Sequence, residues 1–232
     1  MPLNKKPMVL TAELVARVER TERDTSPEPG LSPLNDADYD GIAEGLLRQY
    51  SPTTFWLFAY GSLIWKPDFT SLEHRRGIAY GWHRSFCLEL KSWRGTPEVP
   101  GLMLALDRGG SCRGVVYRLP DDALVANLQR LVRREMSMVP TAFPPRWVRL
   151  ATPDGPLTAL TFAIDRNSGR YVNGLGDEAV ADVLAKACGF RGSMAEYLHA
   201  TVLHLEALGI HDRHLWRLQE LVAERIERAH GI

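Results

Sequence analysis

The spacing of apolar residues changes twice along the chain. Before residue 50 they recur at helical intervals in two short segments, which the proline-rich stretch TSPEPGLSPLND separates. From residue 55 the spacing becomes that of β-strands, and from about residue 177 it is helical again. This order predicts a helical N-terminal extension over residues 1–50 and one larger domain over 51–232. The second helix of the extension is indicated by apolar residues at Tyr39, Ile42, Ala43, Leu46, Leu47 and Tyr50.

The middle of the chain consists of predicted strands. FWLFAY, which begins at Phe55, is a short apolar run, and the apolar residues between 78 and 90 fall mostly on one parity. Two hairpins are expected, one joining LMLALD to CRGVVYRL across residues 108–111 and one joining WVRLAT to LTALTFAI across 153–156. Hairpins imply antiparallel pairing. The sequence therefore predicts an α+β fold whose strands curl into a small barrel with peripheral helices.

Three further helices are predicted after the strands. The first spans about residues 177–188 and ends at Gly189. The second begins with a capping box, in which Ser193 precedes Glu196 by three positions. The last runs from about residue 212 to 229.

Composition and charge exclude several classes of protein. Apolar residues make up 45% and charged residues 24%, which is typical of folded proteins. Lys plus Arg and Asp plus Glu both number 28, so no basic excess points to nucleic acid or to an anionic membrane. No apolar stretch approaches the roughly 18 residues of a membrane helix, and the charged N-terminal segment is unlike a signal peptide. Because the three cysteines (Cys87, Cys112 and Cys188) are far apart and odd in number, we expect free thiols and a cytoplasmic protein.

The first candidate site is YGSL, which runs from Tyr60 to Leu63 at the end of the first predicted strand. A Gly-Ser turn just past a strand can expose successive backbone N–H groups, and such a nest suits a carboxylate or an oxyanion. An isolated Gly-Ser is also what an ordinary strand-to-loop turn contains. The four residues alone leave both interpretations open.

The second candidate is Glu135, near the end of the helix that follows Pro120. The apolar stripe of that helix, continued by three or four positions, reaches Glu135 and places a carboxylate on the buried face. Glutamate is rarely buried without a reason. One reason is an ion pair with a nearby arginine or a frayed helix end, and the other is a general base with a raised pKa. The stripe consists of Leu124, Val125, Leu128, Leu131 and Val132.

Motifs for metals and nucleotides are missing from the sequence. It contains no HExxH, no CxxC, no Cys/His cluster at zinc spacing, no GxGxxG and no Walker loop. We therefore expect neither a metal nor a cofactor. The cysteines lie in predicted strands or a helix, where a buried and inert thiol is usual.

Several long segments, in order, resemble the ChaC proteins, which are glutathione-specific γ-glutamylcyclotransferases. The segments are FAYGSLIWKPDF, GWHRSFCLEL, WRGTPEVPGLMLALDRGGSCRGVVYRLP and RREM, and the resemblance covers roughly residues 55–225. REM followed by a segment that contains proline is similar to the bacterial branch of the family. The extension over residues 1–50 lies outside the resemblance.

The resemblance implies a fold, an activity and a site. The fold is a mixed β-barrel with peripheral helices, and residues 51–232 become the γ-glutamylcyclotransferase-like catalytic domain. The activity is cleavage of glutathione into 5-oxoproline and Cys-Gly, without a metal or cofactor. The catalytic glutamate of the family corresponds to Glu135, and a tyrosine that holds the substrate corresponds to Tyr197. The substrate cradle corresponds to Phe58, Ala59, Tyr60, Gly61, Ser62 and Leu63.

Two alternatives remain open. A cyclotransferase of the same fold could act on other γ-glutamyl amino acids or amines, and only the pocket at the Cys-Gly end would distinguish it. A protein without catalytic activity, such as a regulator of cation transport, is the other, and a Glu135 retained on the inward face argues against it. The sequence gives no indication of the oligomeric state.

Overall fold

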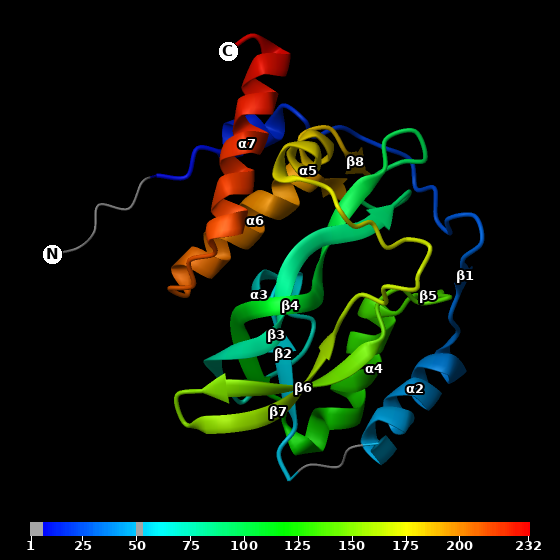
Figure 1. Cartoon of the computed structure of the whole chain (residues 1–232). Coiled ribbons are helices and arrows are strands. Elements are labelled where there is room, and N and C mark those ends of the chain that lie inside the picture. The colour runs from blue at the N-terminus through cyan, green and yellow to red at the C-terminus, as the bar shows by residue number, and fades with distance from the viewer. Residues whose placement is uncertain (1–6, 50–52) are drawn as a thin grey trace, which may run out of the picture. The chain divides into compact units, whose positions relative to one another are not determined.

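The computed structural model describes residues 7–49 and 53–232 (Figure 1). It divides into two compact units, which we describe separately. The helical unit comprises residues up to Ser26, residues 89–103 and residues 172–232, and the barrel unit comprises residues 27–88 and 104–171. Tyr50 and the expected boundary between residues 50 and 51 lie outside the described residues.

The barrel unit is built around a closed barrel, as predicted. Its strands follow the order β2-β4-β3-β6-β7. β2 pairs antiparallel with β4 on one side and parallel with β7 on the other, where Leu57 faces Leu160, so the barrel is mixed. Inward-facing side chains such as Phe58, Leu106 and Val116 form its core. The strands are β2 (Trp56–Ala59), β3 (Glu73–Leu90), β4 (Gly101–Arg118), β6 (Pro145–Thr152) and β7 (Gly155–Phe162).

Of the two predicted hairpins, one is confirmed and one is wrong. β6 and β7 pair from Thr152 and Gly155 at the turn to Pro145 and Phe162 at the far end. Residues 101–118, by contrast, form one continuous strand, β4. Gly109 and Gly110 adopt φ values of +112° and +66°, a left-handed backbone that glycine tolerates. The glycine pair therefore distorts the strand locally without reversing it.

In the described part of the barrel unit, three α-helices accompany the barrel. These are α2 (Asp36–Gln49), the single turn α3 (Ser62–Trp65) and α4 (Leu124–Glu135), which the 3₁₀ turn η1 (Asp121–Ala123) precedes. α2 packs against α4, where Arg133 pairs with Asp36 at 2.9 Å and lies over the ring of Tyr39. A short ladder between β1 (Ser32–Pro33) and β5 (Met138–Val139) completes the unit.

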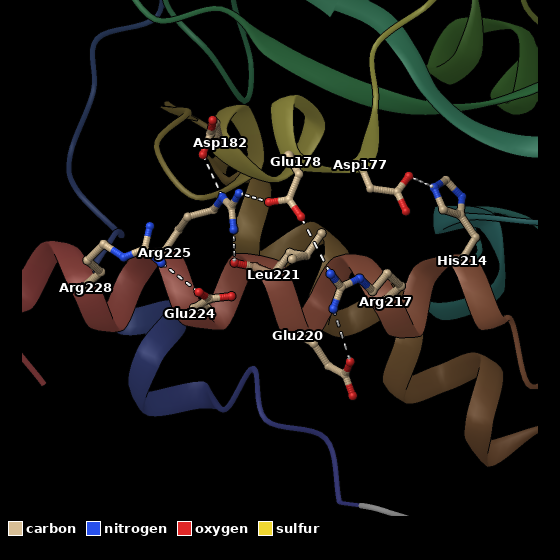
Figure 2. Close-up of polar contacts among 10 residues, drawn as sticks. All are labelled: Asp177, Glu178, Asp182, His214, Arg217, Glu220, Leu221, Glu224, Arg225 and Arg228. Carbon is tan, nitrogen blue, oxygen red and sulfur yellow. Dashed lines mark hydrogen bonds and ion pairs between the residues drawn. The ribbon is translucent and has the colours of Figure 1, made fainter.

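The helical unit contains the remaining helices. Helix α7 packs against both α5 and α6, and a series of ion pairs runs along the contact with α5 (Figure 2). The predicted capping box is confirmed, because the Ser193 hydroxyl accepts a hydrogen bond from the Glu196 amide at 3.0 Å. α5 ends at Leu184, before the predicted position, since the next residues lead into the β8–β9 ladder. The elements are α1 (Ala12–Ala16), α5 (Asp177–Leu184), β8 (Cys188–Gly189), β9 (Gly192–Ser193), α6 (Met194–Ala207) and α7 (Arg213–His230).

The N-terminal segment up to Ser26 belongs to the helical unit and is tied to it by hydrogen bonds. The Leu10 amide donates to Gln219 Oε1 of α7 at 2.9 Å, and Glu19 accepts bonds from the Ser193 amide and hydroxyl. Among the described residues, no helix is long and apolar enough to cross a bilayer.

Candidate active site

The YGSL segment lies between β2 and α3 and is held in place by hydrogen bonds. β2 ends at Ala59 and α3 begins at Ser62. The Tyr60 hydroxyl donates to the Phe162 carbonyl at 2.9 Å, and the Thr161 hydroxyl donates to the Phe58 carbonyl at 3.0 Å. Both bonds join the end of β2 to β7, so they fix the position of the backbone where the YGSL segment begins.

A close backbone contact fixes the other side of β2. Gly114 of β4 lies so near that a Cβ built there would be 2.4 Å from the Ala59 carbonyl oxygen. Only glycine fits at this position without a shift of one of the two strands. β4 and β2 thereby hold Phe58 and Ala59 in fully buried positions directly before YGSL.

Arg84 of β3 holds the YGSL segment through hydrogen bonds to backbone carbonyls. Its side chain is buried, with 5% of the residue exposed, and its Nε donates to the Tyr60 carbonyl at 2.6 Å. Nη2 donates to the Arg113 carbonyl of β4. A buried guanidinium is rare unless it is hydrogen-bonded, and these bonds place its positive charge beside the YGSL backbone.

Arg84 is a site residue that the sequence did not single out, although the strand pattern holds a signal for it. Arg84 shares the parity of Trp82, Phe86 and Leu88, which are apolar and buried. A charged residue on the apolar parity of a strand is as unexpected as a carboxylate on the apolar stripe of a helix.

The first amides of α3 lie at the start of a single helical turn. Within this single turn, the Ile64 amide donates to the Gly61 carbonyl at 2.9 Å and the Lys66 amide to the Ser62 carbonyl at 2.8 Å. The preceding amides, at the start of the turn, have no helical carbonyl to reach. They supply the kind of donor group that a carboxylate or an oxyanion requires.

Glu135 is the last residue of α4 and lies on its buried face, as the periodicity predicts. Leu128, Leu131 and Val132 are fully buried, and the side chain of Glu135 is 15% exposed. Val125, which the predicted stripe included, is 50% exposed, so the buried face is narrower than expected.

Two opposing effects act on the Glu135 carboxyl group. Burial raises its pKa above the ordinary value of 4.5, and the guanidinium of Arg134 acts in the lowering direction without cancelling that rise. The negative end of the α4 dipole also disfavours an anion at this position. Both interpretations of Glu135 from the sequence therefore have a physical basis, since the residue has an arginine partner and a raised pKa.

Arg134 connects Glu135 to YGSL. Its Nε lies 3.1 Å from Glu135 Oε1, and its Nη2 donates to the Ser62 hydroxyl oxygen at 3.0 Å. Nη1 donates to the Lys66 carbonyl just beyond α3. Within the barrel unit, Arg134 thus joins Glu135 to Ser62 of the YGSL segment.

Arg134 was not among the residues that the sequence singled out. Neighbouring positions of a helix point about 100° apart, so the inward direction of Glu135 says little about Arg134. The contact to Ser62 joins residues 72 positions apart in the chain, which no local pattern encodes.

Tyr197 belongs to the helical unit, where it is buried in the first turn of α6. The guanidinium of Arg94 lies 5.4 Å from the centre of its ring. Arg94 Nη1 also donates to the Ser193 carbonyl at 2.7 Å and lies 2.5 Å from Glu196 Oε2. These contacts fix the ring of Tyr197 within its own unit.

Possible metal ligands and the three cysteines lie in the residues that the structure describes. In the ranges that the structure describes, no group of three or more His, Cys, Asp or Glu side chains is placed to hold a metal ion. The three cysteines are free and buried, and burial raises the pKa of the Cys87 thiol to about 12. A thiol in that environment is a poor nucleophile.

Comparison with known proteins places the chain in a family. Residues 55–225 match the family model described as ChaC-like protein. The Escherichia coli protein named glutathione-specific gamma-glutamylcyclotransferase is 39% identical over 158 residues, which cover 68% of either chain. The mouse protein named glutathione-specific gamma-glutamylcyclotransferase 1 is 30% identical over 207 residues, which cover 85% of this chain and 89% of the mouse protein.

A solved structure supports the fold. The crystal structure of a gamma-glutamyl cyclotransferase specific to glutathione from yeast aligns with a TM-score of 0.67 at 21% identity, and the alignment covers 75% of this chain and 97% of the yeast chain. The family model matches most of the chain, the two relatives are at least 30% identical to it, and the chain belongs to the ChaC-like protein family.

Proposed function

We propose that this protein degrades glutathione to 5-oxoproline and Cys-Gly. The family membership and the names of its relatives in Escherichia coli and mouse support this assignment. The observation that carries it in the structure is the largely buried Glu135 carboxylate, joined through Arg134 to Ser62 of YGSL.

The reaction is an intramolecular acyl transfer. The Glu135 carboxylate takes a proton from the α-ammonium group of the γ-glutamyl residue, and the free amine attacks the γ-carbonyl carbon. A C–N bond forms, and the carbonyl oxygen becomes an oxyanion. Glu135 gives this proton to the cysteinyl nitrogen, whose bond to the γ-carbon breaks as the intermediate collapses. The ring nitrogen then loses its second proton to Glu135, which passes it to the released amine, so that 5-oxoproline and the ammonium form of Cys-Gly are produced.

The reaction requires few other groups from the protein. The nucleophile and the electrophile belong to one substrate molecule, so their effective concentration is already high. No water is consumed and no covalent enzyme intermediate is needed. The protein must hold the γ-glutamyl group in a ring-closing conformation, move two protons in turn and stabilise one oxyanion.

YGSL supplies the anion-binding groups in this proposal. The amides from Gly61 to Leu63 bind the substrate carboxylate or the oxyanion, and Phe58 to Tyr60 form the wall behind them. The buried charge of Arg84 favours an anion at the same place. Tyr197 is assigned to substrate binding on the family resemblance.

The direction in which the pKa of Glu135 moves is the one that a general base requires. A carboxylate at the ordinary value is a weak base, and one buried without a partner would stay protonated. Burial raises the pKa of Glu135, and the Arg134 guanidinium limits that rise. In this proposal the carboxylate form of Glu135 accepts the proton, and the Arg134 guanidinium stabilises that form.

We further propose that the protein acts in the cytoplasm and that its activity resides in residues 51–232. Free, buried cysteines agree with a reducing compartment. The family match, over residues 55–225, lies entirely within the proposed catalytic domain.

The test is to incubate the protein with glutathione and, in parallel, with γ-Glu-Ala, and to measure 5-oxoproline. We expect 5-oxoproline and Cys-Gly from glutathione and little product from γ-Glu-Ala. Equal rates would indicate a cyclotransferase of broader specificity. Failure to form 5-oxoproline from either substrate would contradict the proposed activity and favour a protein without catalytic activity.

A further inference from the structure

We propose that Arg134 is a positioning residue that holds Glu135 and Ser62 in one geometry and makes the Ser62 hydroxyl a hydrogen-bond donor to the substrate. The proposal deepens the function above and rests on it. It assigns a role to a residue pair, Arg134 and Ser62, whose side chains lie on different elements of the barrel unit.

The first observation is that one guanidinium reaches three acceptors. Nε lies 3.1 Å from Glu135 Oε1, Nη2 donates to the Ser62 hydroxyl at 3.0 Å, and Nη1 donates to the Lys66 carbonyl. The side chain of Arg134 is 20% exposed, so its conformation is fixed by these contacts and by packing. A planar guanidinium presents its donors in a rigid fork, which fixes the acceptors relative to one another.

The second observation is the direction of the bond to Ser62. A guanidinium only donates, so the Ser62 oxygen accepts from Arg134. The hydroxyl proton must then point away from Arg134. A hydroxyl that accepts from a cation is also a stronger donor, because the bonds polarise one another. Ser62 is thereby prepared to donate to an oxygen of the bound substrate.

The third observation concerns the two oxygens of Glu135. Arg134 engages Oε1, and among the described residues Oε2 has no hydrogen-bond or ion-pair partner. Oε2 is therefore the oxygen that is open to the α-ammonium group. In the described part of the chain, Arg134 is the one charged group that acts on this carboxyl. The segment around α3 contributes the Ser62 hydroxyl and the Lys66 carbonyl, both neutral, to the contacts of Arg134.

Arg134→Gln and Arg134→Lys separate the two parts of the role. Glutamine removes the charge, so the pKa of Glu135 should rise, and the acid limb of the kcat/KM profile should move to higher pH by about one to three pH units. Lysine keeps the charge but cannot reach all three acceptors. We expect a smaller displacement of the acid limb with lysine, together with a lower kcat.

The matched control is Arg133→Gln. Arg133 is the preceding residue of the same helix, is 53% exposed and pairs with the exposed Asp36. We expect its acid limb to stay at the pH of the wild type, and its kcat and KM to remain within about twofold of the wild-type values. An acid limb displaced as far in Arg133→Gln as in Arg134→Gln would show that any lost charge on α4 suffices and would overturn the proposal.

Ser62→Ala tests the donor role directly and also covers the case in which Arg134→Gln does not fold. The variant keeps the Arg134–Glu135 pair, so the acid limb should stay in place while kcat/KM falls about tenfold or more. In the Arg134→Lys background, Ser62→Ala should cost much less than in the wild type, because the two residues act together. Additive losses would overturn the link between them.

These outcomes are distinguishable from failure of the proposed function. If wild-type protein forms no 5-oxoproline from glutathione, the function fails. If the wild type is active but folded Arg134→Gln retains the wild-type acid limb and kcat/KM, only the role of Arg134 fails. Thermal unfolding of each preparation shows which variants are folded.

Discussion

Two sets of ion pairs lie in different environments. In the barrel unit, Arg134 and Glu135 form one pair whose side chains are 20% and 15% exposed. In the helical unit, several arginines of α7 meet acidic residues of α5 and α7 (Figure 2). Their acidic partners are open to solvent, with Glu178 at 65% and Asp182 at 54% exposure.

The difference shows that the number of ion pairs is a poor guide to their importance. Exposed pairs are screened by water and salt and contribute about 0–1 kcal/mol each. A largely buried pair has lost most of its hydration, so breaking it leaves an uncompensated charge. The single pair at the end of α4 can therefore control chemistry, whereas the pairs between α5 and α7 mainly help to align two helices.

The largest effect is expected from Glu135→Gln. The amide keeps the shape of the side chain but cannot accept the α-ammonium proton at neutral pH. Loss of a general base typically costs about 10²–10⁴-fold, or roughly 3–5 kcal/mol, so kcat on glutathione should fall by at least that factor. Glutathione binding should change much less.

Glu178→Gln is the matched carboxylate control, because the Glu178 carboxylate is 65% exposed and pairs with Arg217 and Arg225. Its kcat should remain that of the wild type. Measuring kcat and melting temperature on the same preparations checks both variants. Folded Glu135→Gln protein with wild-type turnover would remove the base from the mechanism.

Arg84→Met should have the next largest effect. The change removes the hydrogen bonds from Arg84 to the buried Tyr60 carbonyl and to the Arg113 carbonyl, which costs about 1–3 kcal/mol of stability, and it loosens the YGSL backbone. Both the melting temperature and kcat/KM should fall. Arg76→Met, at an exposed position of the same strand, should stay within about 0.5 kcal/mol of the wild type. Equal effects of the two substitutions would contradict the special role of the buried guanidinium.

The pH dependence of stability provides a third measurement. Burial raises the pKa of Glu135 in the folded protein, so folding favours the protonated carboxyl. That stabilisation is present below the ordinary pKa of 4.5 and is lost as the pH rises through the folded pKa. The loss amounts to about 1.4 kcal/mol for each factor of ten between the acid dissociation constants of the folded and unfolded states.

Thermal unfolding of the wild type and of Glu135→Gln across this range isolates the effect, because glutamine does not titrate. The wild type should lose stability relative to the variant as the pH rises above 4.5. A difference in melting temperature that is independent of pH would show that the folded and unfolded pKa values coincide.

The smallest effect is expected from Arg225→Gln, which removes the contacts of Arg225 with Glu178 and Asp182. The loss of stability should be about 1 kcal/mol for the two pairs together and should shrink in high salt. Turnover of glutathione should not change. Unfolding curves at low and high salt test this. A loss of several kcal/mol in the free energy of unfolding that salt does not reduce would show that the contacts of Arg225 behave as buried ion pairs.

The sequence predicted those features that repeat along one element. The helical period placed Glu135 on the buried face of α4, and alternation predicted β3. Prediction from the sequence failed where one local pattern fits two structures, because Gly109-Gly110 is compatible with either a hairpin turn or a distorted strand. The contact of Arg134 with Ser62 could not be predicted, because it depends on how α4 packs beside the segment that contains α3.

The bonds from Val9 and Leu10 to Gln219 have a consequence for the newly made chain. Val9 and Leu10 precede Gln219 in the chain by 210 and 209 positions. Ribosomes add about 5–20 residues per second, so the N-terminal segment emerges some 10–40 s before its partner exists. During that interval Leu10, Leu14 and Val15, which are buried in the finished protein, have no α7 to cover them. The helical unit therefore closes only after α7 has been made, and until then the apolar side chains of its first residues are exposed to solvent.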